Sequence, residues 1–543
     1  MGQLEFSIIK KEWIKLKYVF FSAVVVGVCL LAYFAYDLRF TVTSVEPESV
    51  AWYRFAHLGY KPYEFFIPYF IAFGALIALA QFLPERINKR VKIIAHLPLP
   101  LYKSIFIHLL VGLLFIVTFL LFFSLIFLSI ISSLYPEVVV LESAKDMLFF
   151  TIGTIIIYLG ISATILEQIK IKALIKLFVL GVVVAIFYKD HFVLSDLVWV
   201  YILLLMPFVV LDSFYSIKQS YLKNSVFITG VGLGLVFLGF AGFDRYKDEY
   251  SKEFEGYYIF YSPTLKDFVY QKNLGDHNFE YGTKSISIPT QKEYEEYLPF
   301  VFWSNLSIQN RLPIIVDGAS FDRERIKNSR LSLTYKPSYL KQDELNLYPL
   351  LNPISTQGVI KFPEEAISFL DNSVAVYHFD KGIDKALTQR LNKKLKEAKV
   401  SMPIKNVWGK MSNMKPFDLG FIIKDSSDKL YNIRRGDNKI YVKNIKTPKN
   451  SDIVYLRISE NRQKVFAGYA IDKRGDFYLL GFENFEFIKL PLKNFDYKTM
   501  KLKLLSDPLY YTIRYDDGTR YYAEVFDKDL EKIDSIKLDY TMF

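Results

Sequence analysis

The first 243 residues contain long uncharged apolar runs, whereas residues 244–543 show short runs that alternate between apolar and polar positions. A helix needs about 20 apolar residues to cross a bilayer. Seven runs approach or exceed that length: residues 18–36, 65–83, 105–134, 147–166, 173–188, 193–211 and 226–243. The alternating part is rich in Tyr, Phe, Ile and Val, which favours strands. We therefore predict an α-helical polytopic membrane domain followed by a mainly β domain.

Charged residues refine this picture at the ends of the runs. Lys176 and Asp196 lie near the ends of the fifth and sixth runs, and we expect both side chains to reach the membrane interface. Because the runs carry almost no other charge, we expect no buried acid pair or histidine site, and His108 is expected to be a packing residue. A membrane enzyme is therefore the least favoured function.

Lysine and arginine in the short loops indicate the orientation. With the N-terminus in the cytoplasm, the inner segments hold 14 basic and 5 acidic residues, and the outer loops hold 5 and 9. An odd number of spans then places residues 244–543 outside the cytoplasm. The first apolar run lacks a small-residue cleavage pattern, so we expect it to remain as a helix.

Residues 1–17 precede the first run and have an amphipathic pattern. Their apolar face consists of Phe6, Ile9, Trp13 and Leu16. The opposite face carries lysines, which predicts an interfacial helix on the inner leaflet. A simple cytoplasmic extension of the first span is the alternative.

The segment "PERINKRVKIIAHLPLPLYK" connects the second and third spans on the predicted cytoplasmic side. Topology alone accounts for most of its basic residues. Ile87, Val91 and Ile94 have helical spacing, which predicts a short helix over residues 86–96 that ends before Pro98 and Pro100. Such a protrusion suits docking to a soluble partner.

These features together resemble ABC-2-type permeases over residues 1–225. The resemblance rests on the "KKEWIKLK" helix, the glutamate near the inner end of the second span, the short helix and the closing "LP". In that family the segment, here residues 84–100, is a coupling helix that fits a groove on an ATPase subunit. The matching positions are Glu85, Arg86, Asn88, Val91, Ile93, Ile94, Leu97 and Pro98. The family often has a Gly-Thr pair where this chain has Lys89 and Arg90.

The resemblance implies a six-helix permease domain over residues 18–225, with residues 226–243 as a seventh, anchoring helix. It also implies a separate cytoplasmic ATPase, a dimer with a second copy or a paralogue, contact with membrane lipids and a location in the bacterial inner membrane. The C-terminal domain would then be periplasmic. The chain has no phosphate-binding loop, because its only Gly-Lys pair, at 409–410, is followed by Met411. We thus expect no enzyme activity and no cofactor in this chain, with ATP used only by the partner.

Composition excludes several other classes. The only cysteine is Cys29, and the six histidines show no ligand spacing, so we expect no disulfide and no metal site. The net charge of +11 is divided almost evenly between the two parts, so we expect no nucleic-acid partner.

The β domain, residues 244–543, contains a repeated pattern of strand, turn and strand. It is clearest within residues 420–543, where "GFIIKDSSDKLYNI", "GYAIDKRGDFYLL" and "YYTIRYDDGTRYYAEV" recur, and "GYYIFYSPTLKDFVY" is a further candidate. A period of about 40–50 residues suggests the blades of a degenerate β-propeller. A series of hairpins in a sandwich is the alternative. Acids in the turns are expected to shape those turns rather than bind calcium.

Two stretches, "YEEYLPFVFWSNL" and "MPIKNVWGKMSNMKPFDLGF", also resemble an uncharacterised bacterial domain family found near ABC transporter components. We expect a permease subunit whose outer domain handles cargo or a partner. The alternative is a membrane-anchored scaffold that binds a periplasmic partner protein, for example in metalloenzyme maturation. His277 and His378 are expected to be surface or hydrogen-bonded residues.

Overall fold

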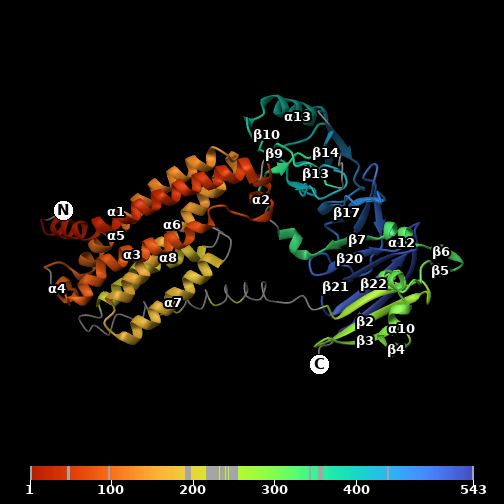
Figure 1. Cartoon of the computed structure of the whole chain (residues 1–543), viewed down its shortest axis with the longest axis horizontal. Coiled ribbons are helices and arrows are strands. Elements are labelled where there is room, and N and C mark those ends of the chain that lie inside the picture. Colours follow the sequence, from red (N-terminus) through yellow and green to blue (C-terminus); the bar gives the residue numbers. More distant parts are fainter. Residues whose placement is uncertain are drawn as a thin grey trace. The chain divides into compact units, whose positions relative to one another are not determined.

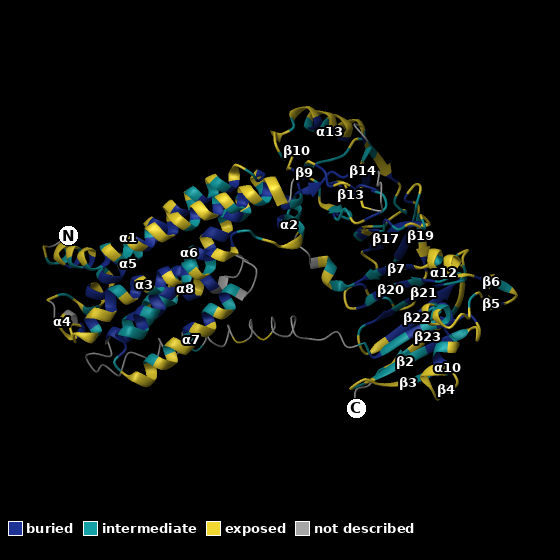
Figure 2. Ribbon diagram, in the orientation of Figure 1, coloured by how far each residue is buried: buried dark blue, intermediate teal, exposed yellow. Residues whose placement is uncertain are grey.

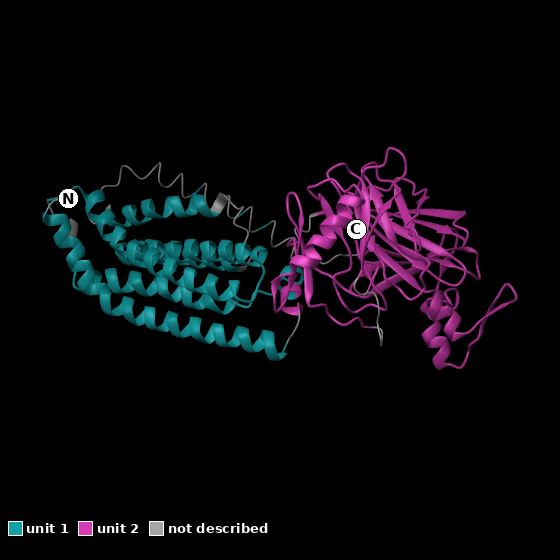
Figure 3. Cartoon of the chain, turned by 90° about the horizontal axis from the view of Figure 1, so that it is seen from above, with its two compact units in different colours: residues 1–47, 54–251 teal, residues 48–53, 252–543 magenta. Residues whose placement is uncertain are grey.

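The computed structural model of the chain describes residues 3–45, 49–95, 98–189, 197–215, 255–341, 344–352, 359–436 and 439–540, with the single residues 232, 239 and 243. The chain divides into two compact units, shown in Figure 3. The helical unit comprises residues 1–47 and 54–251, and the β unit comprises residues 48–53 and 252–543. The predicted order, helices first and strands second, is confirmed.

The helical unit is an all-α bundle (Figure 1). Its elements are α1 (Gln3–Phe40), a π-helical turn (Thr41–Val45), α2 (Val50–Leu58), η2 (Glu64–Phe66), α3 (Ile67–Ile87), α4 (Val91–Ala95), α5 (Leu101–Ser132), α6 (Glu137–Leu166), α7 (Lys170–Lys189) and α8 (Leu197–Tyr215). Helix α6 packs against α3, α5, α7 and α8, and α1 packs against α3 and α5.

Five helical stretches are long and apolar enough to cross a membrane, namely 3–45, 64–87, 101–132, 137–166 and 170–188. They coincide with the first five predicted spans. The sixth prediction corresponds to α8, whose apolar stretch, Trp199–Phe214, is shorter. The seventh, residues 226–243, lies outside the described residues apart from single positions. Large apolar side chains on the bundle surface, such as Ile171 and Leu174 of α7, are exposed (Figure 2). In a bilayer such a surface contacts lipid.

Helices α3 and α6 approach each other closely at Gly74. A Cβ at this position would lie 2.5 Å from the backbone oxygen of Thr154. Only glycine fits such an approach, because any other side chain would push the helices apart. The hydroxyl of Thr154 donates to the carbonyl oxygen of Phe150 on its own helix (2.9 Å), so it is satisfied at the contact.

The β unit contains five sheets built on consecutive antiparallel strands. The first holds β1 (Tyr257–Ser262), β2 (Asp267–Gly275), β3 (Asn278–Thr283) and β4 (Ser287–Ile288). The second holds β8 (Tyr348–Pro349), β9 (Glu365–Phe369), β10 (Val374–His378) and β11 (Gly382–Ile383). The third holds β12 (Asn406–Trp408), β13 (Phe421–Lys424), β14 (Leu430–Gly436) and β15 (Lys439–Ile445). The fourth holds β16 (Ile453–Ile458), β17 (Phe466–Asp472), β18 (Phe477–Gly481) and β19 (Phe487–Leu490).

The fifth sheet has five strands. They are β20 (Lys501–Ser506), β21 (Tyr511–Asp516), β22 (Arg520–Phe526) and β23 (Lys532–Asp539), with β7 (Leu331–Tyr335) paired to β20. A small hairpin, β5 (Ile314–Val316) and β6 (Ala319–Phe321), stands apart. The helical elements of this unit are α10 (Gln291–Glu296), α11 (Trp303–Ile308), α12 (Arg323–Ser329), η4 (Pro337–Lys341) and α13 (Lys385–Glu397).

The five sheets pack in series. Separate apolar cores join the second sheet to the third, the third to the fourth, the fourth to the fifth and the fifth to the first. In the described residues no core joins the first sheet to the second, and no closed propeller or barrel is found. The predicted propeller is thus corrected to an open series. Strand β7 also covers the edge of β20, an edge that a propeller would turn toward its central channel.

The repeated hairpins that the sequence predicts are present. They are β1–β2, β13–β14, β17–β18 and β21–β22. Inner strands such as β17 are buried at every position, since sheets cover both of their faces. A fifth hairpin, β9–β10, was not predicted. Its turn, "LDNS", contains Asp371 and Asn372, which are typical turn residues.

Acidic residues shape three of these turns. Asp425, Asp472 and Asp516 each end the first strand of a hairpin or directly follow it. A carboxylate oxygen of each accepts hydrogen bonds from backbone N–H groups of its own turn, at 2.9–3.1 Å. The side chains therefore act within the turns, as residues of this type commonly do.

The first turn of α2 belongs to the β unit (Figure 3). The Ser49 backbone N–H and hydroxyl both donate to the carbonyl oxygen of Pro363, at 3.1 and 2.6 Å. Trp52 is 3% exposed, and its ring centroid lies 5.5 Å from that of Phe379. Residues that follow the first predicted span thus complete the packing of the β unit.

Candidate functional site

The predicted coupling segment, residues 84–100, begins inside α3 rather than at a separate helix. Arg86 and Ile87 are the last residues of α3, and α4 starts only at Val91. Lys89, with φ of 55°, adopts the left-handed conformation between them. Its N–H donates to the Arg86 oxygen (3.2 Å), and the next N–H, of Arg90, donates to the Glu85 oxygen (2.9 Å). This pair of bonds is a Schellman motif, so the single predicted helix 86–96 is corrected to two helices separated by a cap.

The exposed part of this segment is strongly basic. Lys89, Arg90 and Lys92 are exposed and Arg86 is half-buried. None of these four side chains has an ion-pair partner among the described residues. Of the other matching positions, Val91 is buried and packs inward. Asn88, Ile93 and Pro98 are exposed, and the side chains of Ile94 and Leu97 lie outside the described residues.

Glu85, another of the matching positions, is only 1% exposed. Lys11 Nζ and Lys15 Nζ of α1 lie 2.8 and 3.0 Å from its Oε1 atom. Lys15 also pairs with Glu12, at 2.8 Å, and Glu12 is fully buried. We refer to Lys11, Glu12, Lys15 and Glu85 as the inner ion network. It fastens the start of α1 to the end of α3, directly before the coupling segment.

Polar side chains extend this network into the bundle. Lys15 donates to the backbone oxygen of Gln81 (2.9 Å), and the Gln81 amide links Tyr158 to the backbone of His108 (both 2.7 Å). His108 is 1% exposed, and its Nε2 lies 3.7 Å from Glu12 Oε1. The expectation that the spans lack a buried acid and histidine was therefore wrong.

The inner ion network also explains which face of α1 packs inward. Helix α1 continues without a break from the predicted interfacial segment into the first span. Ile8, Glu12 and Leu16 are buried, whereas Phe6 and Trp13 are 65% and 46% exposed. Of the remaining predicted interfacial residues, Ile9 is half-buried. The i, i+4 spacing of Ile8, Glu12 and Leu16 is a signal that the sequence analysis did not use, because it assigned the apolar face to Phe6, Ile9, Trp13 and Leu16.

Two further ionic clusters lie at helix ends. Lys176 Nζ contacts Glu167 (2.8 Å) and Asp212 (3.0 Å). That this side chain reaches the membrane interface stays a prediction. Lys61 Nζ lies 2.7 Å from the fully buried Asp146, which also accepts a hydrogen bond from the Tyr63 hydroxyl. Charges at the ends of these apolar helices are thus neutralised within the bundle.

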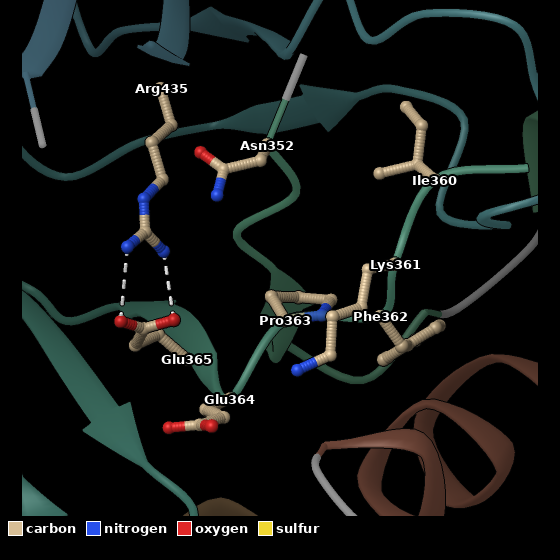
Figure 4. A pocket seen from close by; sticks show the side chains of 8 residues that line it. All are labelled: Asn352, Ile360, Lys361, Phe362, Pro363, Glu364, Glu365 and Arg435. Carbon is tan, nitrogen blue, oxygen red and sulfur yellow. Dashed lines mark hydrogen bonds and ion pairs between the residues drawn. The ribbon is translucent and has the colours of Figure 1, made fainter. Parts of the chain in front are cut away.

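The β unit has a pocket of about 330 Å³ between the second and third sheets (Figure 4). Arg435 of β14 forms a two-pronged ion pair with Glu365 of β9, at 2.8 and 3.1 Å. The side chains of Asn352, Lys361 and Glu364 complete the polar lining. Because both prongs of the guanidinium are used on Glu365, the pair fixes one wall of the pocket.

Three residues beside this pocket could offer ligands to a metal. Atoms of Glu364, His378 and Asp380 lie within 4.8 Å of one another. The backbone N–H of Asp380 donates to His378 Nδ1 (3.2 Å), so the neutral ring carries its proton on Nε2, 3.1 Å from Glu364. A metal bound to Nε2 would require the ring proton on Nδ1, but the backbone N–H of Asp380 already points at Nδ1. The geometry fits a Glu–His hydrogen bond better, and the absence of a metal stays a prediction. His277 is exposed in the β2–β3 turn.

Comparison with known proteins gives one match. A domain described as "Domain of unknown function (DUF4857)" is found over residues 258–524, within the β unit. No ABC-2 permease family matches the chain. No curated protein and no solved structure matches it. The chain is thus similar to DUF4857 proteins over its β unit, in line with the predicted resemblance of this part to an uncharacterised domain family.

Proposed function

We propose that the chain is the membrane subunit of a transport system driven by a separate cytoplasmic ATPase. The N-terminus and residues 84–100 would face the cytoplasm, and the β unit would lie in the periplasm and handle cargo or a partner protein. A second copy or a paralogue would complete the pathway. The chain itself would hydrolyse nothing and hold no cofactor.

The proposal rests on one observation. An exposed basic segment directly follows a helix end that the inner ion network holds in place. Arg86 at the end of α3, Lys89 and Arg90 in the cap that follows, and Lys92 in α4 have no described ion-pair partner and could meet an acidic groove. A force applied to the segment would therefore reach both α1 and α3 and would not be absorbed by a flexible loop.

Co-purification tests this function. The tagged chain, extracted from its own host in detergent, should retain an ATPase in a fixed ratio. Arg86→Glu and Lys89→Glu should each remove that ATPase and leave the fold intact. Lys172→Glu is the matched control, since this lysine is also exposed and lies near a predicted cytoplasmic helix end. Retention of the ATPase by both segment variants would refute the docking role.

The second candidate is a scaffold whose spans serve only to anchor the β unit. The DUF4857 match, which is confined to the β unit, favours it. The same purification separates the two candidates. A retained periplasmic protein without any ATPase would support the scaffold and move the function to the β unit.

A further inference from the structure

A second cavity in the β unit, of about 190 Å³, lies where β20 ends beside β7 and β21. Strand β1 and the turn that follows α10 complete it. Its walls are largely apolar and include Phe260, Tyr261, Phe300, Leu331 and Leu505. A site of this kind takes a small ligand with an apolar body, and a few polar groups determine its orientation.

Two of the polar groups in this cavity lack protein partners. Arg330 lies at the end of α12, and its guanidinium has no hydrogen bond or ion pair to any described residue. Thr512 of β21 is only 5% exposed, and its hydroxyl likewise has no partner in the described part of the chain. The Thr512 hydroxyl is not among the fully buried atoms without a partner, and Arg330 is exposed, so both groups remain accessible to a ligand in the cavity.

The one acid in the cavity is already engaged. Asp507 Oδ1 accepts hydrogen bonds from the backbone N–H groups of Leu509 and Tyr510, both at 2.7 Å. Burial raises the pKa of Asp507 to about 6. Lys528 Nζ lies next to it and donates to the Ser506 hydroxyl, at 3.0 Å. At neutral pH this carboxyl is ionised, and the neighbouring Lys528 ammonium offsets its charge.

Further positive charge lies on the same face of the fifth sheet. Arg514 and Lys503 lie two positions from Thr512 and Leu505, so their side chains share the cavity face at a spacing of about 7 Å. Burial and the nearby Arg514 guanidinium lower the pKa of Lys503, and Glu255 opposes this shift. Glu255 also lies 3.9 Å from Arg514, so Arg330 is the cation of the cavity lining that no described acid pairs with.

We propose that this cavity binds a small organic anion that carries one carboxylate or phosphate on a short apolar body. Arg330 and Thr512 hold the anionic group, and the aromatic side chains of β1 and Phe300 enclose the body. This inference does not depend on the transport function, because it concerns the β unit alone.

Calorimetric titration of the full chain in zwitterionic nanodiscs tests the proposal, with phenyl phosphate, benzoate and benzylamine as probes. One of the two anions should bind, and benzylamine should not. Arg330→Ala should weaken the anion by about tenfold or more, since it removes a charge-assisted contact. Thr512→Val keeps the shape of the side chain and should weaken binding about tenfold through loss of the hydroxyl.

Arg323→Ala is the matched control, because Arg323 lies on the same helix but does not line the cavity. It should leave anion binding unchanged. Binding of benzylamine as tight as that of the anions would overturn the charge assignment. Anion binding that survives Arg330→Ala, or the absence of binding by either anion at millimolar concentration, would overturn the site.

Discussion

Lys15 on α1 donates a 3.0 Å hydrogen bond to the buried carboxylate of Glu85 at the end of α3. The two residues are 70 positions apart in the chain, so the contact ties the N-terminal helix to the segment that we propose meets an ATPase. We expect Glu85→Gln to lower the free energy of unfolding of the helical unit by about 3 kcal/mol, since it leaves Lys11 and Lys15 short of a counter-charge. Thermal unfolding followed by helical circular dichroism measures this.

Glu5→Gln provides the control for that prediction. It breaks the pair between Glu5 and Lys103, which also joins two helices but whose lysine side chain is 49% exposed. Exposed pairs contribute about 1 kcal/mol or less, so this change should be small. Equal losses of unfolding free energy in the two variants would show that the inner ion network stabilises the helical unit no more than an exposed ion pair does.

Lys89→Gly should stabilise the protein. Lys89 is held at φ 55°, where glycine meets no steric penalty, and the gain should be about 1 kcal/mol. Lys92→Gly, within α4, should instead cost up to about 1 kcal/mol, because glycine weakens a helix interior. Thermal unfolding of the two variants should therefore shift in opposite directions. A loss of stability in both would mean that the Lys89 side chain makes a contact that offsets its backbone strain.

Gly420→Ala should be far more damaging than Gly518→Ala in the β unit. Both glycines have positive φ, at 74° and 87°, so alanine is strained at both. A Cβ at Gly420 would also lie 2.0 Å from the carbonyl oxygen of Ile433, whereas nothing lies within 4 Å at Gly518. We expect a loss of about 1 kcal/mol at Gly518 and several times more at Gly420, measured by denaturant unfolding. Similar losses would show that β13 and β14 can move apart.

The stability of the β unit should depend on pH through Asp507. The pKa of Asp507 is raised from 3.8 to about 6 in the folded protein, so the folded state binds its proton more tightly than the unfolded state. The stabilisation is complete below pH 4 and is lost as pH rises through about 6. Asp507→Asn keeps an oxygen for the two backbone N–H groups but cannot titrate. The melting temperature of this variant minus that of the wild type should increase as the pH is raised from 4 to 6.5. A constant difference across that range would contradict the assignment.

Hydrophobic periodicity was enough to predict five spans and four hairpins. Apolar runs of the right length form membrane helices whatever their partners, and turn residues such as Asp and Gly define hairpins locally. The β9–β10 hairpin was missed although its turn contains Asp371 and Asn372, because its strands do not match the repeated pattern of the other hairpins. The open arrangement of the sheets was also missed, since a repeated pattern does not show which sheets share an apolar core. The pairing of β7 with β20 joins segments far apart in the chain and has no local signal either.

That residues 84–100 form a coupling segment stays a prediction, and the single helix expected over residues 86–96 was wrong. An apolar spacing of i, i+4 and i+7 is compatible with one helix, and nothing local marks Lys89 as left-handed. The resembling family, however, often has glycine at this position. The inner ion network was missed for a different reason. The sequence analysis considered Glu85 only as part of the segment and did not consider Glu12, whereas their burial results from the pairing of two helices.

The docking of Ser49 and Trp52 into the β unit has a consequence for how that unit is made and isolated. Residues 49–53 are synthesised long before residue 252. The second sheet therefore packs against a segment that is made before most of the helices. A recombinant piece that begins at residue 252 would lack this element and would leave Phe379 and the Pro363 oxygen uncovered. A synthetic peptide that spans residues 46–58, added in trans, is therefore the natural complement for any such fragment.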